Sequence, residues 1–293
     1  MLSAHPAGPF SHRVAGLPRL GIGVSTEYGA ARSPGSLDVF ALAHAHPRFA
    51  AFLEVGIEVG KGLDDDARRW VAQGRPATYH FLDVNLDDAA DELDDDWLAS
   101  VRDTVQVLQP AWLCGDAGLW HFGRRDRGHM LLLPPILVDD AATDFASGVR
   151  RLAAATGCEV LPENPPGTVF VGDLHVLEFF TRVCERADCG MLLDVAHLAM
   201  FQHVTGRGLF DDIAFPWERV VEVHVAGTSE RLVDGFSVVD DSHTAQVSAA
   251  TWSLFEHVVA RARNLKAVVF ECERNRNDDV IEAFERIARI WSP

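Results

Sequence analysis

Acidic and imidazole side chains stand at or near the carboxyl ends of short apolar segments along most of this chain. Seven of eight such segments carry an ionisable residue there. These residues are Glu54, His80, Asp116, Glu163 with Asn164, Asp194 with His197, Glu222 with His224, and Glu271. Carboxylates brought close together raise one another's pKa or require a cation. A single acid at a strand end is commonly a helix N-cap, so the prediction of a metal site depends on their number.

The donor types narrow the choice of metal. Carboxylate, amide and imidazole groups together suit iron, manganese, magnesium or zinc, and imidazole favours iron or zinc over magnesium. Glu222 and His224 are two residues apart on an expected strand and therefore share a face. Asp241 and His243 have the same spacing and could form a second pair if that loop is extended, although an exposed polar turn explains this spacing equally well. So many ligands could hold two metal ions.

The elements that would bring these residues together alternate in type. Short apolar, β-branched runs predict strands at Leu20–Ser25, Phe52–Gly56, Ala77–Asp83, Pro110–Gly115, Cys158–Asn164, Gly190–Val195, Val220–Ala226 and Lys266–Cys272. Helical periodicity predicts helices that include Asp95–Leu108, Ala141–Ala155, Asp173–Arg186, Ser248–Arg263 and Asp278–Ile290. Such alternation predicts a parallel sheet, and eight strands close a (β/α)₈ TIM barrel, whose active sites lie at the carboxyl ends of its strands.

The chain length fits one such barrel. It has 293 residues, and a barrel takes roughly 250. We expect a single α/β domain, a TIM-barrel catalytic domain over 19–293, preceded by a flexible arm over 1–18 that lacks periodicity. An open doubly wound sheet is the main alternative, but Thr26 stands where the third glycine of its phosphate-binding turn would follow Gly21 and Gly23. The longest loops are expected over 121–130 and 228–247.

Composition excludes several classes of protein. The formal net charge of −17 disfavours binding to nucleic acid, whose phosphates it repels. No apolar run approaches the roughly 20 residues that span a bilayer, and the amino terminus lacks a signal-peptide pattern, so we expect a cytoplasmic protein without membrane contact. The five cysteines include no Cys-x-x-Cys pair, which argues against disulfides and against a thiolate zinc site.

An ordered series of motifs resembles a known family. It comprises Gly-Ile-Gly-Val from Gly21, Phe-Leu-Glu-Val with Glu54, the histidine His80, Gly-Asp-Ala-Gly-Leu-Trp with Asp116 and Trp120, Leu-Pro-Glu-Asn with Glu163 and Asn164, Leu-Asp-Val-Ala-His with Asp194 and His197, Glu-Val-His-Val-Ala-Gly with His224, Asp-Ser-His with Asp241 and His243, and Glu271. From Gly21 to about Glu273 the chain is similar to the DUF692 family, the multinuclear non-heme iron-dependent oxidative enzymes. These enzymes modify ribosomally made peptides and use a barrel fold.

The resemblance implies an activity and its cofactors. It implies two, possibly three, non-heme iron ions with O₂ as cosubstrate, and oxidation of a Cys, Asp or Asn residue in a precursor peptide. It also implies a separate partner protein that recognises the peptide. The metal ligands carried over are Glu54, His80, Asp116, Glu163, Asn164, Asp194, His197, His224, Asp241, His243 and Glu271. We assign one metal to Glu163, Asp194, His224 and Glu271, and its neighbour to His80, Asp241, His243 and Glu54.

Three departures from the family pattern reduce the expected number of metals. Tyr28 falls near the place of a histidine after the first strand, and Ala117 replaces the histidine of the fourth-strand motif. His197 stands in a segment that reads Asp-Val-Asn-Asn in the family. We therefore expect two irons rather than three.

The basic segment Gly-Arg-Arg-Asp-Arg-Gly supplies expected substrate contacts. Its Arg124, Arg125 and Arg127 could receive a peptide carboxylate through bidentate hydrogen bonds, with Trp120 beside them, although a solvated loop is the simpler interpretation.

Two other functions compete with peptide oxidation. A xylose-isomerase-like isomerase or a hydrolase would use similar ligands with Mn, Mg or Zn and without O₂. A lysine near the site would favour an isomerase, and the lysines Lys61 and Lys266 are not placed for that role. A catalytically degenerate barrel that only binds metal or peptide is the alternative from a different class, because the loss of ligand histidines is what such decay would produce.

Overall fold

The strands form a closed parallel barrel in a computed structural model that describes residues 8–26, 35–88, 93, 95–122, 131–210 and 214–292. The barrel order is β1-β12-β9-β8-β6-β4-β3-β2. The strands are β1 (Gly21–Thr26), β2 (Phe52–Ile57), β3 (Ala77–Phe81), β4 (Leu113–Asp116), β6 (Val160–Glu163), β8 (Met191–Asp194), β9 (Val220–Ala226) and β12 (Ala267–Glu271). Each overlaps one of the eight runs expected from the sequence. The TIM barrel is therefore confirmed, and the open doubly wound sheet is excluded because β1 pairs with β12.

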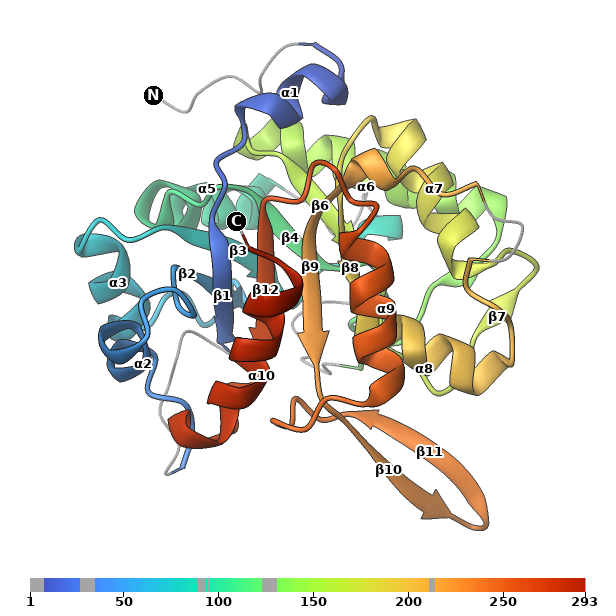
Figure 1. Ribbon diagram of the computed structural model, residues 1–293. Helices are drawn as coiled ribbons and strands as arrows, with labels where there is room; N and C mark the ends of the chain where they lie inside the picture. The colour runs from blue at the N-terminus through green and yellow to red at the C-terminus, as the bar shows by residue number, and fades with distance from the viewer. Residues whose placement is uncertain are drawn as a thin grey trace.

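Helices surround the barrel (Figure 1). They are α2 (Val39–Ala45), α3 (Asp65–Ala72), α5 (Asp95–Leu108), α6 (Asp139–Thr156), α7 (Val176–Ala187), α8 (Val195–Thr205), α9 (Ala249–Val259) and α10 (Asn277–Ile290), with short 3₁₀ turns at Leu86–Asp88 and Trp217–Arg219. Their starts follow ordinary capping chemistry, since Asp64 accepts a hydrogen bond from Ala67 N and Ser248 accepts one from Thr251 N. None of the described helices has the length and apolarity needed to cross a membrane.

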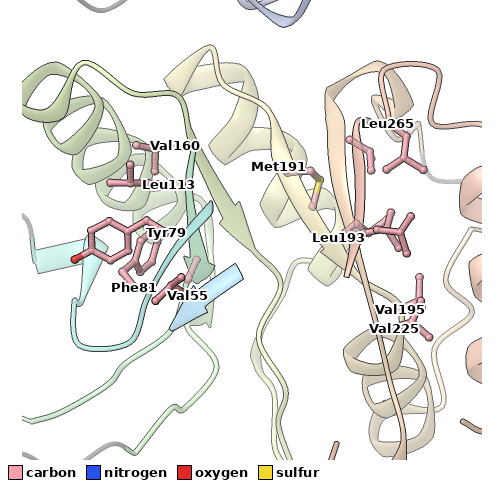
Figure 2. Packing of buried hydrophobic residues seen from close by; sticks show 14 of the residues in the cluster. Val55, Tyr79, Phe81, Leu113, Val160, Met191, Leu193, Val195, Val225 and Leu265 are labelled. Atoms are coloured by element: carbon pink, nitrogen blue, oxygen red, sulfur yellow. The ribbon is translucent and has the colours of Figure 1, made fainter. Parts of the chain in front are cut away.

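The main apolar core lies between the strands and the helices. Figure 2 shows Val55, Leu193 and Val225 in this layer. Each is a sequence neighbour of a polar residue named above, because successive side chains of a strand point to opposite faces. The same alternation that buries these side chains against the helices therefore turns Glu54, Asp194 and His224 toward the barrel axis.

The amino-terminal segment closes the floor of the barrel, the end opposite the carboxyl ends of the strands (Figure 1). Helix α1 (Phe10–Gly16) buries Phe10 and Val14 against inward-facing residues of the lower barrel, including Trp112 and Leu161. Within the arm expected over 1–18, the described part, 8–18, contains this helix. A single short helix gives too little periodicity to recognise, and only the barrel supplies the surface that buries it.

The segment after β9 forms a projecting hairpin instead of the expected loop over 228–247. Strands β10 (Thr228–Val233) and β11 (Phe236–Asp241) pair antiparallel and extend from the carboxyl end of the barrel (Figure 1). The register places Thr228 opposite Asp241, so β11 returns the chain to the mouth of the barrel. A second small sheet pairs β5 (Ile136–Leu137) with β7 (Val171–Gly172) in parallel.

Candidate metal centre and active site

The carboxyl ends of the strands surround one cavity of about 370 Å³. Its polar lining consists of Ser25, Thr26, Glu54, His80, Asp116, His197, Asp241, His243, Glu271, Glu273 and Arg274. An apolar wall stands on one side, formed by Leu82, Trp120, Leu132 and Pro166. These four residues come from segments that follow β3, β4 and β6, which are neighbours in the barrel.

An inner cluster lies at the base of the cavity and consists of Glu54, His80, Glu163, His224 and Glu271. His224 is fully buried at its centre, with Nε2 3.1 Å from Glu54 Oε1 and Nδ1 3.3 Å from Glu163 Oε1. Glu271 Oε1 is 3.4 Å from the same Nδ1. His80 Nε2 lies 2.9 Å from Glu163 Oε2. Four residues from four other strands therefore meet around the His224 imidazole.

An outer cluster lies nearer the hairpin and consists of His197, Asp241 and His243. Asp241 Oδ2 is 3.2 Å from His197 Nε2 and 3.1 Å from His243 Nε2. His197 Nδ1 lies 2.8 Å from the carbonyl oxygen of Asn164, so a proton on Nδ1 would leave Nε2 free to coordinate a metal. Ligating histidines usually donate their second N–H in this way.

Glu273 orients His243 in the same way, because Glu273 Oε1 lies 2.6 Å from His243 Nδ1. This contact fixes His243 Nε2 toward Asp241. His243 adopts a left-handed backbone conformation, with φ of 49°, which costs free energy in a non-glycine residue and is common at functional sites.

Asp194 and Asn164 hold each other in place where β6 and β8 end. The Asn164 carboxamide accepts from Asp194 N and donates to Asp194 O, both at 2.9 Å. Both the oxygen and the nitrogen of the Asn164 side chain are therefore hydrogen-bonded to the backbone of Asp194. Asp194 caps α8 through Oδ1, which accepts from His197 N at 2.6 Å, while its Oδ2 is buried without a hydrogen-bond partner among the described residues. The same carboxylate is both a cap and a candidate ligand.

Gly115 allows Asp116 to point into the cavity. Its φ of 152° suits glycine, and a Cβ there would lie 2.7 Å from the carbonyl oxygen of Phe81. Asp116 is buried beside His80 and Glu163. Beyond it, Asn85 Oδ1 accepts from Trp120 N at 2.7 Å and fixes the start of the following loop.

The protonation states show what balances the charge of the cavity in the metal-free protein. Burial alone would lower the pKa of His80, but the charge of Glu54 and the hydrogen bond to Glu163 raise it to about 9. The pKa values of His197, His224 and His243 are also raised well above the usual value, since nearby carboxylates outweigh burial. Burial raises the pKa of Asp194 to about 8 despite His197. Protons on the imidazoles therefore stand in for a cation.

The donor set fits a divalent metal. Groups of three ligand atoms that all lie within 4.8 Å of one another are Glu54–His80–His224, His80–Asp116–Glu163, Glu163–Asp194–His197, Asp194–His224–Glu271 and Glu54–Cys114–Glu222. Several of their polar atoms are buried without a hydrogen-bond partner among the described residues, namely Asp116 Oδ1, Asp194 Oδ2, His224 Nδ1 and Glu271 Oε2. Buried polar atoms without partners are costly, and an ion between them would satisfy them.

The structure brings together most of the expected site residues, but in a different grouping. Glu163, Asp194, His224 and Glu271 lie together, as expected for one metal. Glu54 and His80 contact this same inner cluster, whereas Asp241 and His243 pair with His197. Sequence reasoning missed Glu273, although its position two residues after Glu271 offered a signal. It also missed Cys114, which lies two residues before Asp116 on the same face of β4.

Three of the four expected substrate contacts, Arg124, Arg125 and Arg127, fall outside the described residues, as does Tyr28. Trp120, expected to contact substrate, lines the cavity and donates from Nε1 to the Asp116 carbonyl oxygen at 3.2 Å. Ala117 is fully buried, and its N–H donates to Glu163 O at 2.9 Å.

Comparison with solved structures shows the same fold. A xylose isomerase domain containing protein from Salmonella typhimurium LT2 superposes with a TM-score of 0.58 at 12% identity, covering 93% of this chain and 96% of that one. A xylose isomerase-like TIM barrel protein from Mycobacterium smegmatis, solved in complex with magnesium, gives a TM-score of 0.56 at 10% identity, covering 92% and 96%.

Sequence relatives cover most of the chain. A UPF0276 protein of Rhizorhabdus wittichii is 26% identical over 247 residues, which make up 83% of this chain and 84% of that protein. A UPF0276 protein of Bordetella pertussis is 28% identical over 262 residues, or 85% and 84%. Residues 39–291 match the sequence profile of a family described as RiPP precursor modification enzyme MbnB/TglH/ChrH. That match includes every proposed metal ligand, and this chain belongs to the MbnB/TglH/ChrH (DUF692) family, whose description implies a metal enzyme that modifies ribosomally made peptides.

Proposed function

We propose that the protein catalyses an iron- and O₂-dependent oxidation of a Cys, Asp or Asn side chain in a ribosomally synthesised precursor peptide. The observation that supports this most strongly is the set of buried histidine and carboxylate donors at the mouth of the barrel, in a chain that belongs to a peptide-modifying family. Imidazole and carboxylate donors with open positions are the ligands of non-heme iron oxygenases.

The grouping of donors supports two metal positions. The inner one would use His224 Nδ1 with Glu163, Asp194 and Glu271, and the outer one would use His197, Asp241 and His243. Iron bound there would supply the one-electron redox chemistry with O₂ that oxidises the peptide side chain.

The residues of the chain have separable roles around these positions. Glu273 and the Asn164 carbonyl orient His243 and His197 through their Nδ1 atoms. The apolar wall, which includes Leu82 and Trp120, limits access of water from one side and offers a surface to the residues that flank the modified side chain. The cavity of about 370 Å³ has room for one side chain with its backbone, not for a folded protein. An extended peptide segment is the substrate form that this shape favours.

Metal analysis combined with O₂ uptake tests the proposal. The protein would be purified without added metal, its iron, manganese and zinc measured per chain, and O₂ consumption followed with candidate precursor peptides, with and without a co-purified partner protein. We expect two irons per chain and peptide-dependent O₂ uptake, with an altered peptide mass. A protein that holds only zinc or manganese and ignores O₂ would disprove peptide oxidation.

A metal-dependent isomerase or hydrolase is the second candidate, favoured by the fold shared with xylose isomerase-like proteins, one of them solved with magnesium. A lysine at the site would favour an isomerase, but neither Lys61 nor Lys266 lines the cavity. Turnover of a sugar with manganese or magnesium under anaerobic conditions would support this candidate, and metal binding without turnover of any kind would support a degenerate binding barrel.

A further inference from the structure

A third group of ligand-type side chains shares Glu54 with the inner cluster and extends one layer deeper into the barrel. It consists of Glu54 on β2, Cys114 on β4 and Glu222 on β9, each at most 1% exposed. One donor atom from each residue lies within 4.8 Å of the other two. Cys114 precedes Asp116 by two residues and Glu222 precedes His224 by two, so strand alternation places both below a residue of the cavity.

The contacts of this deep group leave one carboxylate oxygen unused. Trp112 Nε1 donates to Glu222 Oε2 at 2.6 Å, which fixes the orientation of the carboxylate. Glu222 Oε1 is buried and has no hydrogen-bond partner among the described residues. The hydroxyl of Thr78, two residues before His80 and on the same face of β3, is also buried without one. A bound ligand would satisfy such buried polar atoms, which are costly without partners.

Glu54 links the deep group to the inner cluster. Its Oε1 lies 3.1 Å and its Oε2 3.2 Å from His224 Nε2, and Oε2 also accepts from Cys114 Sγ at 3.2 Å. The Glu54 carboxylate therefore contacts residues of both groups. The floor beneath the deep group is apolar, with Phe52, Leu161 and Val269 in its cluster, so water is excluded from below and an uncompensated carboxylate there is costly.

We propose that Glu54, Cys114 and Glu222 form a metal site of their own, below the mouth of the barrel, that takes a thiolate-binding divalent ion, Zn²⁺ or Fe²⁺. Thiolate donors favour these ions over Mg²⁺ and Ca²⁺, which prefer oxygen ligands alone. Zn–S distances near 2.3 Å and Zn–O distances near 2.0–2.2 Å are compatible with donor atoms less than 4.8 Å apart. The site needs no Cys-x-x-Cys pair, because its three donors come from separate strands that only the closed barrel brings together.

Cobalt substitution tests the site directly, because a thiolate bound to Co²⁺ produces a charge-transfer band in the near ultraviolet that carboxylate and imidazole ligands do not. The full-length protein would be stripped of metal with a chelator and titrated anaerobically with Co²⁺, recording the spectrum and the bound cobalt per chain. We expect the thiolate band in the wild-type protein. In Cys114→Ser the band should disappear and bound cobalt should fall by one ion per chain.

Matched variants separate this site from other thiols and from the clusters above it. Cys158→Ser and Cys272→Ser, which remove a half-buried and a buried thiol that belong to none of the ligand groups found among the described residues, should retain the band. Glu222→Gln keeps the thiol and should weaken the band strongly, so it decides the matter if Cys114→Ser fails to fold. Wild-type protein saturated with Co²⁺ that lacks a thiolate band, or a band that survives in Cys114→Ser, would overturn the proposal.

The result is independent of peptide oxidation. A thiolate band without iron-dependent O₂ uptake would support the deep site and count against the proposed function. Iron-dependent O₂ uptake without a thiolate band would disprove the deep site and leave the proposed function intact.

Discussion

The two ends of the barrel both bury carboxylates, but they neutralise them in different ways. At the floor, the buried Glu159 is held by Arg13 through two hydrogen bonds of 3.0 Å, and the half-exposed Asp188 beside it accepts from Phe10 N and from Arg219. At the mouth, the ion-pair partners of Glu54 and Glu163 are histidines. Arginine stays charged at any relevant pH, whereas a histidine can release its proton. The carboxylates at the floor therefore keep their positive partners at every relevant pH, whereas the protons on the histidines at the mouth can be exchanged for a metal ion.

The strongest test of this contrast removes the central imidazole of the mouth. His224→Ala deletes the contact between Glu54, Glu163 and Glu271, and we expect the loss of at least one metal per chain and a fall of more than about 100-fold in turnover, since even partners outside the ligand set typically contribute 10–100-fold. Metal analysis and a peptide assay measure both. The exposed His44→Ala on α2 is the control and should change neither. Full metal content in His224→Ala would remove this residue from the ligands.

The matching change at the floor should affect stability alone. Arg13→Met leaves Glu159 buried without its cation, and breaking a buried pair typically costs about 3–5 kcal/mol. We expect chemical denaturation to show a loss of this order, while the folded variant keeps its metal and its turnover. Arg68→Met, at an exposed arginine on α3, serves as the control and should be near neutral. Loss of metal from folded Arg13→Met would show that the two ends are not independent.

A smaller effect is expected from the carboxylate that orients His243. Glu273→Gln keeps the shape of the side chain but weakens the hydrogen bond from His243 Nδ1, so metal affinity of the outer cluster should fall about 10- to 100-fold. A competition titration with a metal chelator measures this, and Glu285→Gln, exposed on α10, is the matched control. Unchanged metal affinity in Glu273→Gln would show that this contact does not orient His243 for metal binding.

At the mouth of the barrel, the stability of the metal-free protein and the affinity for metal should change with pH in opposite directions. The pKa of His80 is about 9 in the metal-free protein, above its ordinary value of 6.5. A raised pKa means that this histidine stabilises the metal-free fold fully below about pH 6.5 and loses that contribution as pH rises through 9. A metal needs the neutral imidazole, so its affinity should rise by up to about tenfold per pH unit and per displaced proton over that window.

Thermal unfolding with and without metal checks this prediction. The difference in Tm between the loaded and the metal-free protein should widen from pH 6.5 to 9. His80→Gln should flatten that dependence, and a constant difference across the range in the wild-type protein would show that protons and metal do not compete at the mouth.

The sequence determined the barrel and most of the candidate ligands. Alternation of short apolar runs with helical segments depends on local chemistry, and residues such as Glu163 and His224 can be recognised from their position at the ends of such runs. Spacing also placed Glu222 and His224 on one face. Periodicity reveals the direction of a side chain along its own strand, so these predictions needed no knowledge of the neighbouring strands.

Only the tertiary structure decided which of these residues meet. His197 joins Asp241 and His243 because α8 begins at the end of β8 while the hairpin returns β11 to the mouth, and these segments are separated by some forty residues of sequence. Barrel closure likewise brings Cys114 beside Glu54 and sets α1 against the floor. Such contacts depend on the register between strands and on the path of loops, neither of which leaves a local pattern in the sequence.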